Sequence, residues 1–411
     1  MFTPYRTILS QPGTMAFSAT GWFARLPISM VGLGLVLLVS SSTGSYALAG
    51  SVSAASVVAS AVTAPFQARL VERRGQHVML PILAGVNAAT LGGLVVVVHA
   101  GIPTPVPQVL AAVVGASSPL VGSYVRARWT HRLEGRPELQ TAFALEALLD
   151  EVVFMVGPPL VTVLATTVSP VAGLLTAMVA GLVGSLMLAA QRRTQPPVHA
   201  HRAGSGTKPA LGWATLGPVV VACAGLGVLF GSAEVVVVAV ASEAGHRSAS
   251  GLLLAGWATG SMLSALITGA MRLRMPPMNR FRIGAAVMAA TMLPLPFISE
   301  LGVLGPVLFL AGFAISPTLV ASMAVVQRTV PPSRLTEGMA WTTTGMAAGV
   351  AAGAAVAGQV IDAAGGRAGF YVPLAAGLLT ALVAFAGRAP SRPDSAVASP
   401  SDDATELTGA H

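Results

Sequence analysis

The feature that most constrains this chain is a succession of long apolar stretches separated by short polar breaks. A helix needs about 20 apolar residues to cross the hydrocarbon core of a bilayer. A sliding window of about 19 residues finds twelve such stretches. We therefore expect an all-α integral membrane protein with twelve transmembrane helices, at 16–40, 45–66, 78–99, 106–125, 140–166, 170–190, 214–241, 248–270, 283–299, 302–325, 336–361 and 369–387.

The composition excludes other broad classes of protein. Charged residues make up 9% of the chain and hydrophobic residues 54%, whereas soluble proteins have roughly 25% charged residues. The formal net charge of +8 is spread over short segments without a long basic run, so we expect no nucleic-acid partner. The single cysteine, Cys223, cannot form a disulfide within the chain.

The placement of basic residues predicts the topology. If the N-terminus lies inside, every Lys and Arg falls in an inner segment except Arg25, Arg247 and Arg367. Cytoplasmic loops of membrane proteins carry this excess of basic residues. We therefore expect a multi-pass protein of the cell (inner) membrane with both termini in the cytoplasm.

The chain divides into two halves. Its longest polar interior stretch lies within 191–213 and is rich in Pro, Gly, Ser and basic residues, which predicts a flexible cytoplasmic linker. It separates an N-terminal six-helix half, 1–190, from a C-terminal six-helix half, 214–388. The remainder, 389–411, has the composition of a disordered cytoplasmic tail.

The halves also resemble each other in sequence. Gly32-Leu33-Gly34 recurs as Gly225-Leu226-Gly227, and Arg132 and Gly157 recur as Arg328 and Gly353. Similar offsets at matching positions indicate two parallel six-helix repeats. Repeats related by an axis along the membrane normal are an architecture of alternating-access transporters.

The loop after the second stretch contains Glu72, Arg73 and Gly75. The segment resembles the signature Gly-x-x-x-Asp/Glu-Arg-x-Gly of the major facilitator superfamily, with Ala68 in place of the leading Gly. The resemblance extends over about residues 16–388. It implies a cytoplasmic gate motif that latches the two halves in the outward-facing state. The alternative is a tight loop whose basic residues only fix the topology.

The fifth stretch contains Gly157-Pro158-Pro159. It is similar to the Gly-Pro motif of drug/proton antiporters in the same family, although Val153 and Val161-Thr162 replace further glycines. The resemblance implies a hinge and favours export. A simple kink is the alternative, because proline removes a backbone hydrogen bond from a helix.

Five ionisable residues lie within the predicted spans: Arg25, Glu146, Asp150, Glu151 and Glu234. Charges at membrane depth are costly and mark functional sites. The four acids are candidates for proton coupling, with Asp150 or Glu151 first and Glu234 next. Permanent pairing with Arg25 or with a loop arginine, and direct contact with substrate, are the alternatives. Arg25 is also a candidate for the substrate cavity, unless the first span begins late enough to leave it at the interface.

Further candidates for the substrate cavity are Trp257, Trp341 and Thr342. Trp341 is equally suited to anchor its helix at the membrane interface. In the same span Gly345, Gly349 and Gly353 recur every four residues, a spacing that lets helix backbones pack closely.

Together these features predict a secondary active transporter that moves a small molecule by alternating access. Proton-coupled efflux of an amphiphilic compound or metabolite is the leading expectation. Proton-coupled uptake of a nutrient is the alternative, and a transporter-like membrane sensor a more distant one. The sequence has no Walker A loop and no catalytic constellation within the spans, so we expect no enzyme activity, no cofactor and no metal site. The expected partners are the substrate, protons and the lipid bilayer, with the protein a monomer.

Overall fold

The structure is a computed structural model that describes residues 3–136, 138–197, 213–270, 275–330 and 335–387. The predicted tail and most of the predicted linker lie outside these ranges. The described residues form helices joined by short loops, without a β-strand among them. Helices suit a bilayer because each satisfies its own backbone hydrogen bonds where water is absent.

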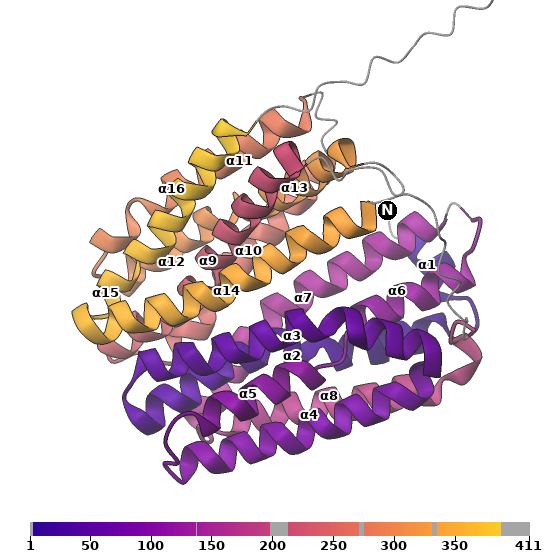
Figure 1. Cartoon of the computed structure of the whole chain (residues 1–411), viewed down its shortest axis with the longest axis horizontal. Coiled ribbons are helices and arrows are strands. Elements are labelled where there is room, and N and C mark those ends of the chain that lie inside the picture. Colours follow the sequence, from indigo (N-terminus) through magenta and orange to yellow (C-terminus); the bar gives the residue numbers. More distant parts are fainter. Residues whose placement is uncertain (1–2, 137, 198–212, 271–274, 331–334, 388–411) are drawn as a thin grey trace, which may run out of the picture.

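The two halves form two layers of helices, one above the other in Figure 1. The helices of the N-terminal half, which ends in the short 3₁₀ helix η1 (Arg192–Thr194), are α1 (Thr3–Leu9), α2 (Thr14–Thr43), α3 (Tyr46–Arg74), α4 (Gln76–His99), α5 (Val106–Ser117), α6 (Val121–Arg132), α7 (Glu138–Thr167) and α8 (Ala172–Ala190). Those of the C-terminal half, which includes the 3₁₀ helix η2 (Leu295–Phe297), are α9 (Trp213–Glu243), α10 (Ala249–Ala270), α11 (Pro277–Met292), α12 (Leu301–Gly312), α13 (Ile315–Thr329), α14 (Leu335–Ala364), α15 (Gly366–Gly369) and α16 (Tyr371–Ala386).

Within the described residues, eleven segments are helical, long and apolar enough to cross a membrane. Helices α5 and α6 together make one of these crossings, as do α12 and α13. The ninth predicted span corresponds to α11, which has 16 residues and is too short to meet the same criterion. The structure therefore confirms an all-α membrane fold, and α11 supplies the remaining segment of the twelve.

The packing repeats from one half to the other. In the N-terminal half α2 contacts α7 and α8, and α3 contacts α5. The equivalent helices of the C-terminal half make the equivalent contacts: α9 with α14 and α16, and α10 with α12. Between the halves α3 packs on α14, and α10 packs on α7. Helix α3 is equivalent to α10, and α7 to α14, so each of these contacts becomes the other when the halves are interchanged. The halves are therefore related as parallel repeats.

Glycines allow close packing between α9 and α14. A Cβ atom added to Gly349 would lie 1.9 Å from the carbonyl oxygen of Ala224, and one added to Gly353 would lie 2.2 Å from that of Val228. On the facing helix, a Cβ at Gly231 would lie 2.0 Å from the carbonyl oxygen of Val350. The glycine spacing in α14 therefore has the packing role predicted from the sequence.

Large apolar side chains cover much of the outer surface. Leu382 on α16, Val96 on α4 and Leu310 on α12 are each at least 60% exposed. A soluble monomer rarely presents so much contiguous apolar surface. Contact with lipid tails accounts for it, because hydrocarbon solvates these side chains.

Candidate functional site

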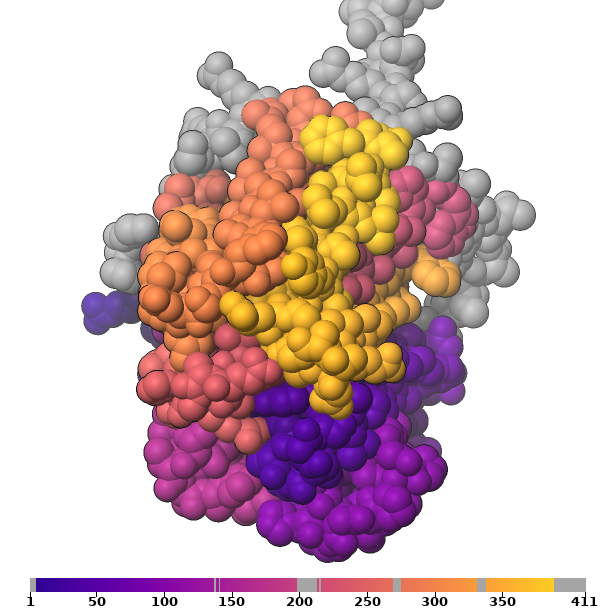
Figure 2. Space-filling view, turned by 90° about the vertical axis from the view of Figure 1, so that its left-hand side faces the viewer, coloured from indigo at the N-terminus to yellow at the C-terminus, as the bar shows by residue number. Residues whose placement is uncertain are grey.

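The halves are joined at one end of the bundle, which we call the closed end. It comprises the α2–α3 turn, the α9–α10 loop, the last turn of α14 and α15. It lies to the left in Figure 1, and α1 lies at the opposite end, which we call the terminal end. Figure 2 looks onto the closed end, where the yellow atoms of the C-terminal half meet the indigo atoms of the N-terminal half.

Asp362 at the end of α14 caps a helix of the other half. Its carboxylate accepts hydrogen bonds from the Ser45 hydroxyl at 2.7 Å and from the backbone N–H groups of Tyr46 and Ala47 at 2.8 and 2.9 Å. The first N–H groups of a helix have no partner within the helix and carry partial positive charge, so an acidic group there is stabilising. A side chain of the C-terminal half thus caps the first turn of α3 in the N-terminal half.

Arg247 makes the converse contact from the α9–α10 loop. Its Nη2 donates to the Leu37 carbonyl oxygen at 2.9 Å and to the Ser40 hydroxyl at 2.5 Å, in the last turns of α2. Burial lowers the pKa of the Arg247 guanidinium, and these oxygens replace part of its lost hydration. A cation near a helix C-terminus complements the helix dipole. Both of these groups of hydrogen bonds between the halves lie at the closed end.

Glu234 lies deeper, where α9 faces α2. A Cβ atom added to Gly32 would lie 3.2 Å from Glu234 Oε1 and 3.3 Å from its Oε2. The side chain is half-buried and forms no hydrogen bond or ion pair with another described residue. Glu234 is therefore a carboxyl group between the halves, opposite a glycine and without a compensating cation among the described residues.

Two aromatic rings lie near Glu234. Phe230 precedes it by one helical turn on the same face of α9. Its ring lies 5.3 Å from that of Trp257 on α10, centroid to centroid. Trp257 is 6% exposed, and its indole N–H is buried without a hydrogen-bond partner among the described residues. Sequence reasoning missed Phe230, because one phenylalanine in an apolar stretch carries no signal.

Arg25 forms an ion-paired cluster with two of the predicted acids. Its guanidinium bonds the Glu146 carboxylate and donates to Asp150 Oδ1 at 2.6 Å, and both Arg25 and Glu146 are fully buried. Glu146 Oε1 also accepts from the Ser18 hydroxyl at 2.7 Å and from the Trp129 indole at 2.8 Å. The first span extends far enough that Arg25 lies inside it, bound within its own half.

A second arginine pairs with this cluster on its exposed side. Arg126 on α6 donates to Asp150 Oδ2 at 2.6 Å. Asp150 is thus held between two cations, which favours permanent pairing for Glu146 and Asp150. Glu151, turned away on α7, is half-buried and forms no hydrogen bond or ion pair with another described residue.

The gate motif forms the turn between α3 and α4, at the terminal end. Gly75 ends α3 with φ 84°, a backbone conformation that residues other than glycine rarely adopt. Glu72 and Arg73 are exposed on the last turn of α3. A Cβ at Gly75 would lie 2.7 Å from Gln195 Nε2, and Gln195 Oε1 accepts from the His77 N–H at 3.0 Å.

The segment against this turn is fixed by Arg128. This fully buried arginine donates to the Gln191 carbonyl oxygen at 3.0 Å, the Thr194 hydroxyl at 2.8 Å and the Gln76 side chain at 2.7 Å. Residues 191–195 of the predicted flexible linker are therefore an ordered extension of the N-terminal half. Sequence reasoning missed this anchor, because Arg128 is one of several arginines in the same loop region.

Replacing Gly75 with Ala tests how far this turn depends on glycine. We expect the variant to lose about 1–3 kcal/mol of stability, because it combines a left-handed backbone with contacts to Gln195 and His77. Gly135→Ala is the matched control, with φ 72° and no atom within 4 Å of its Cβ. The melting midpoint in detergent should fall further for Gly75→Ala. Equal decreases would show that the backbone angle accounts for the whole effect.

The Gly157-Pro158-Pro159 segment lies inside α7, which continues unbroken from Glu138 to Thr167. A Cβ at Gly157 would lie 1.9 Å from the Ser29 hydroxyl on α2. The Pro158 carbonyl oxygen lies 2.6 Å from the corresponding position at Gly251 on α10. The segment is thus where α7 packs both on its own half and on the other, and its role as a hinge stays a prediction.

Trp341 and Thr342 lie at the terminal end, in the second turn of α14. Trp341 is 43% exposed and packs edge-to-face on Trp213 at 5.3 Å. Thr342 is buried and donates to the Met339 carbonyl oxygen of its own helix at 2.8 Å. Two exposed tryptophans at helix starts fit an interfacial anchor better than a substrate cavity.

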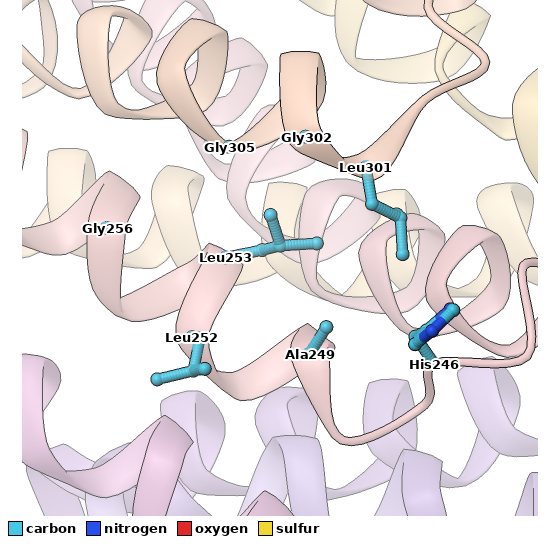
Figure 3. Close-up of a pocket in the computed structure, with 8 residues that line it drawn as sticks. All are labelled: His246, Ala249, Leu252, Leu253, Gly256, Leu301, Gly302 and Gly305. Atoms are coloured by element: carbon cyan, nitrogen blue, oxygen red, sulfur yellow. The ribbon is translucent and has the colours of Figure 1, made fainter.

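A pocket of about 500 Å³ opens between α10 and α12 (Figure 3). Its lining is apolar apart from His246, and it contains none of the residues predicted to bind substrate or protons: His246, Ala249, Leu252, Leu253, Gly256, Leu301, Gly302 and Gly305. We therefore place the candidate site at Glu234 between the halves and not in this pocket.

Two repeated six-helix halves with acidic groups at membrane depth define the class of polytopic membrane transporters. The family model of the Major Facilitator Superfamily matches residues 17–309 and 303–409. The chain belongs to this superfamily, whose members are transporters rather than enzymes. No curated protein sequence matches the chain significantly.

Solved structures of transporters share the fold. A mutant of the nucleoside transporter NupG matches with a TM-score of 0.72 and 14% identity, over 91% of this chain and 98% of its own. The human organic anion transporter MFSD10 (TETRAN) gives a TM-score of 0.61 at 15% identity, over 91% and 100%. A bacterial metal transporter gives 0.57 at 17%, over 90% and 98%. The protein is thus a multi-pass membrane transporter of a small molecule.

Proposed function

We propose that the protein exports an amphiphilic small molecule across the inner membrane by alternating access, in exchange for protons. The observation that carries the proposal is Glu234, a carboxyl group without a compensating cation among the described residues, between two halves that are hydrogen-bonded at one end. Such a group can bind and release a proton without breaking an ion pair. It also faces whichever side of the membrane the halves open toward.

The termini are cytoplasmic in this proposal, so the closed end faces outward. The hydrogen bonds of Asp362 and Arg247 then hold the outer side shut. Opening outward requires breaking them, while the gate motif at the terminal end stabilises the alternative state. Each contact satisfies helix-end groups that water can also satisfy, so the exchange costs little free energy.

Of the predicted proton sites, the geometry favours Glu234. Glu146 and Asp150 are occupied by Arg25 and Arg126, so protonating either would leave a guanidinium without its partner. Glu151 has no cation among the described residues, but it belongs to a helix of the N-terminal half. Glu234 faces the other half, where protonation can be coupled to the movement between the two.

Transport in proteoliposomes tests the proposal. Vesicles holding a panel of amphiphilic compounds and metabolites are given an imposed pH gradient, and each compound is followed across the membrane. We expect at least one compound to move against its concentration gradient, and a protonophore to stop that movement. Gradient-driven transport that a protonophore leaves unchanged would contradict proton coupling. Movement in the direction of the proton flux would contradict export and indicate uptake.

A further inference from the structure

We propose that Glu234, Phe230 and Trp257 form a binding site for an organic cation, an amphiphilic molecule with one positive charge and aromatic or aliphatic bulk. The inference rests on the proposed function and names the substrate class of the same site. The three similar transporters carry chemically different cargoes by their names. The substrate class must therefore be argued from the side chains of this chain.

The charge of the site favours a cationic ligand. Glu234 is opposed on α2 by Gly32, and the arginine of α2, Arg25, is bound to Glu146 and Asp150. The described charges of α3 and of α13 lie in the last turns of those helices, at the terminal end. Helices α10 and α16 have no charged residue.

Among the described residues of the closed end, no cation forms an ion pair with Glu234. Asp362 caps α3, and Arg367 on α15 is exposed. Arg247 is committed to the carbonyl oxygen of Leu37 and the hydroxyl of Ser40. Within the described residues the site therefore presents one negative charge without a protein partner. A carboxylate in a region of reduced polarity favours a ligand of opposite charge, since burying an unpaired charge is costly.

The aromatic groups of the site also favour a cationic ligand. Phe230 is half-buried and shares the face of α9 with Glu234, and the ring of Trp257 packs against it at 5.3 Å. Aromatic faces attract cations through their electron density, and tryptophan does so most strongly. The indole N–H of Trp257, unpartnered among the described residues, adds a hydrogen-bond donor for a ligand oxygen or nitrogen.

The site is accessible to a ligand. Because Gly32 has no side chain, nothing from that residue of α2 covers the Glu234 carboxylate, which a Cβ there would already contact at 3.2 Å. Both Glu234 and Phe230 retain exposed surface in the structure. A ligand can thus reach the carboxylate and the ring through their exposed surface.

A pair of probes with the same shape and opposite charge tests the inference. Tetraphenylphosphonium carries one positive charge and tetraphenylborate one negative charge on similar tetrahedral frames. Binding of each to the detergent-solubilised protein is measured by titration calorimetry. We expect the phosphonium to bind and the borate not to bind. Equal binding of the two probes, or preference for the borate, would overturn the assignment of a cation.

Substitutions place the probe at the site. Glu234→Gln should weaken phosphonium binding by more than about tenfold, and Phe230→Leu by at least about threefold. Glu151→Gln is the matched control, because it removes the same charge within the N-terminal half and should leave binding unchanged. Unchanged binding in Glu234→Gln, in protein that elutes as a single species, would overturn the location.

The outcome is separable from that of the proposed function. If the borate binds as well as the phosphonium while some neutral or anionic compound shows protonophore-sensitive transport, the cation assignment fails and proton-coupled transport stands. If the phosphonium binds at Glu234 but no compound responds to a pH gradient, the binding site stands and proton coupling fails.

Discussion

The Glu234→Gln variant should lose gradient-driven accumulation of substrate, down to the level of vesicles without protein, while still exchanging substrate across the membrane at zero gradient once the substrate concentration is raised to offset its weaker binding. The amide keeps the shape of the side chain but cannot release a proton at working pH. Substrate can therefore still move with the two halves, but the movement is no longer tied to protons. Exchange by this variant should also lose the pH dependence of the wild type.

Two controls define this result. Glu151→Gln removes another half-buried acid that has no ion-pair partner among the described residues, and it should keep accumulation. Size-exclusion elution as a single species shows that each variant is folded. If Glu151→Gln loses accumulation and Glu234→Gln keeps it, the coupling site lies in α7. This is the site expected from the sequence, where Asp150 and Glu151 are the first candidates.

Replacing Arg25 with Met should have the largest effect on stability. It leaves the fully buried Glu146 carboxylate without its cation. Among the described residues, only Ser18 and Trp129 then donate hydrogen bonds to it. Removing one partner of a buried ion pair costs about 3–5 kcal/mol. We expect little folded protein in the membrane, with a melting midpoint in detergent well below that of the wild type.

Arg126→Met is the matched control for this change. Arg126 pairs with the same Asp150, but its side chain is 40% exposed, and an exposed pair is worth about 0–1 kcal/mol. Its melting midpoint should stay close to that of the wild type. Restoration of folding in the double variant Arg25→Met, Glu146→Gln would show that the unpaired carboxylate is the cause. Equal stability of Arg25→Met and the wild type would contradict the structural role of the cluster.

Hydropathy predicted the helical membrane fold, because it follows from the energetics of a single helix in a bilayer. Helix ends were less predictable. The second span, expected at 45–66, continues as helix to Arg74, since basic residues extend a helix into the aqueous interface without a break in hydrogen bonding. The ninth and tenth spans were the least cleanly separated in the sequence, and the helix of the ninth span, α11, is short.

The i, i+4 spacing put Glu146 and Asp150 on one face, and pairing with Arg25 or with a loop arginine was one of the alternatives that the sequence offered. Which arginine pairs with which acid could not be predicted, because it depends on which helix faces meet. Arg247 did carry a signal, as a rare exception to the inner placement of basic residues. An arginine in a loop predicted to lie outside calls for a specific partner, and the structure supplies one in the last turns of α2.

The most direct test of alternating access coupled to protons is a distance measurement that needs no substrate. Cys223 is the single cysteine, so after its replacement by Ser, spin labels are placed on exposed positions in two pairs. Ser42 and Ala364 span the halves at the closed end, and Thr130 and Gln327 span them at the terminal end. Distances in each pair are measured by pulsed electron spin resonance at high and low pH. We expect opposite changes, with one pair lengthening as the other shortens, and no pH response in Glu234→Gln. Distances that stay fixed with pH in both pairs, or that change in the same direction, would contradict it.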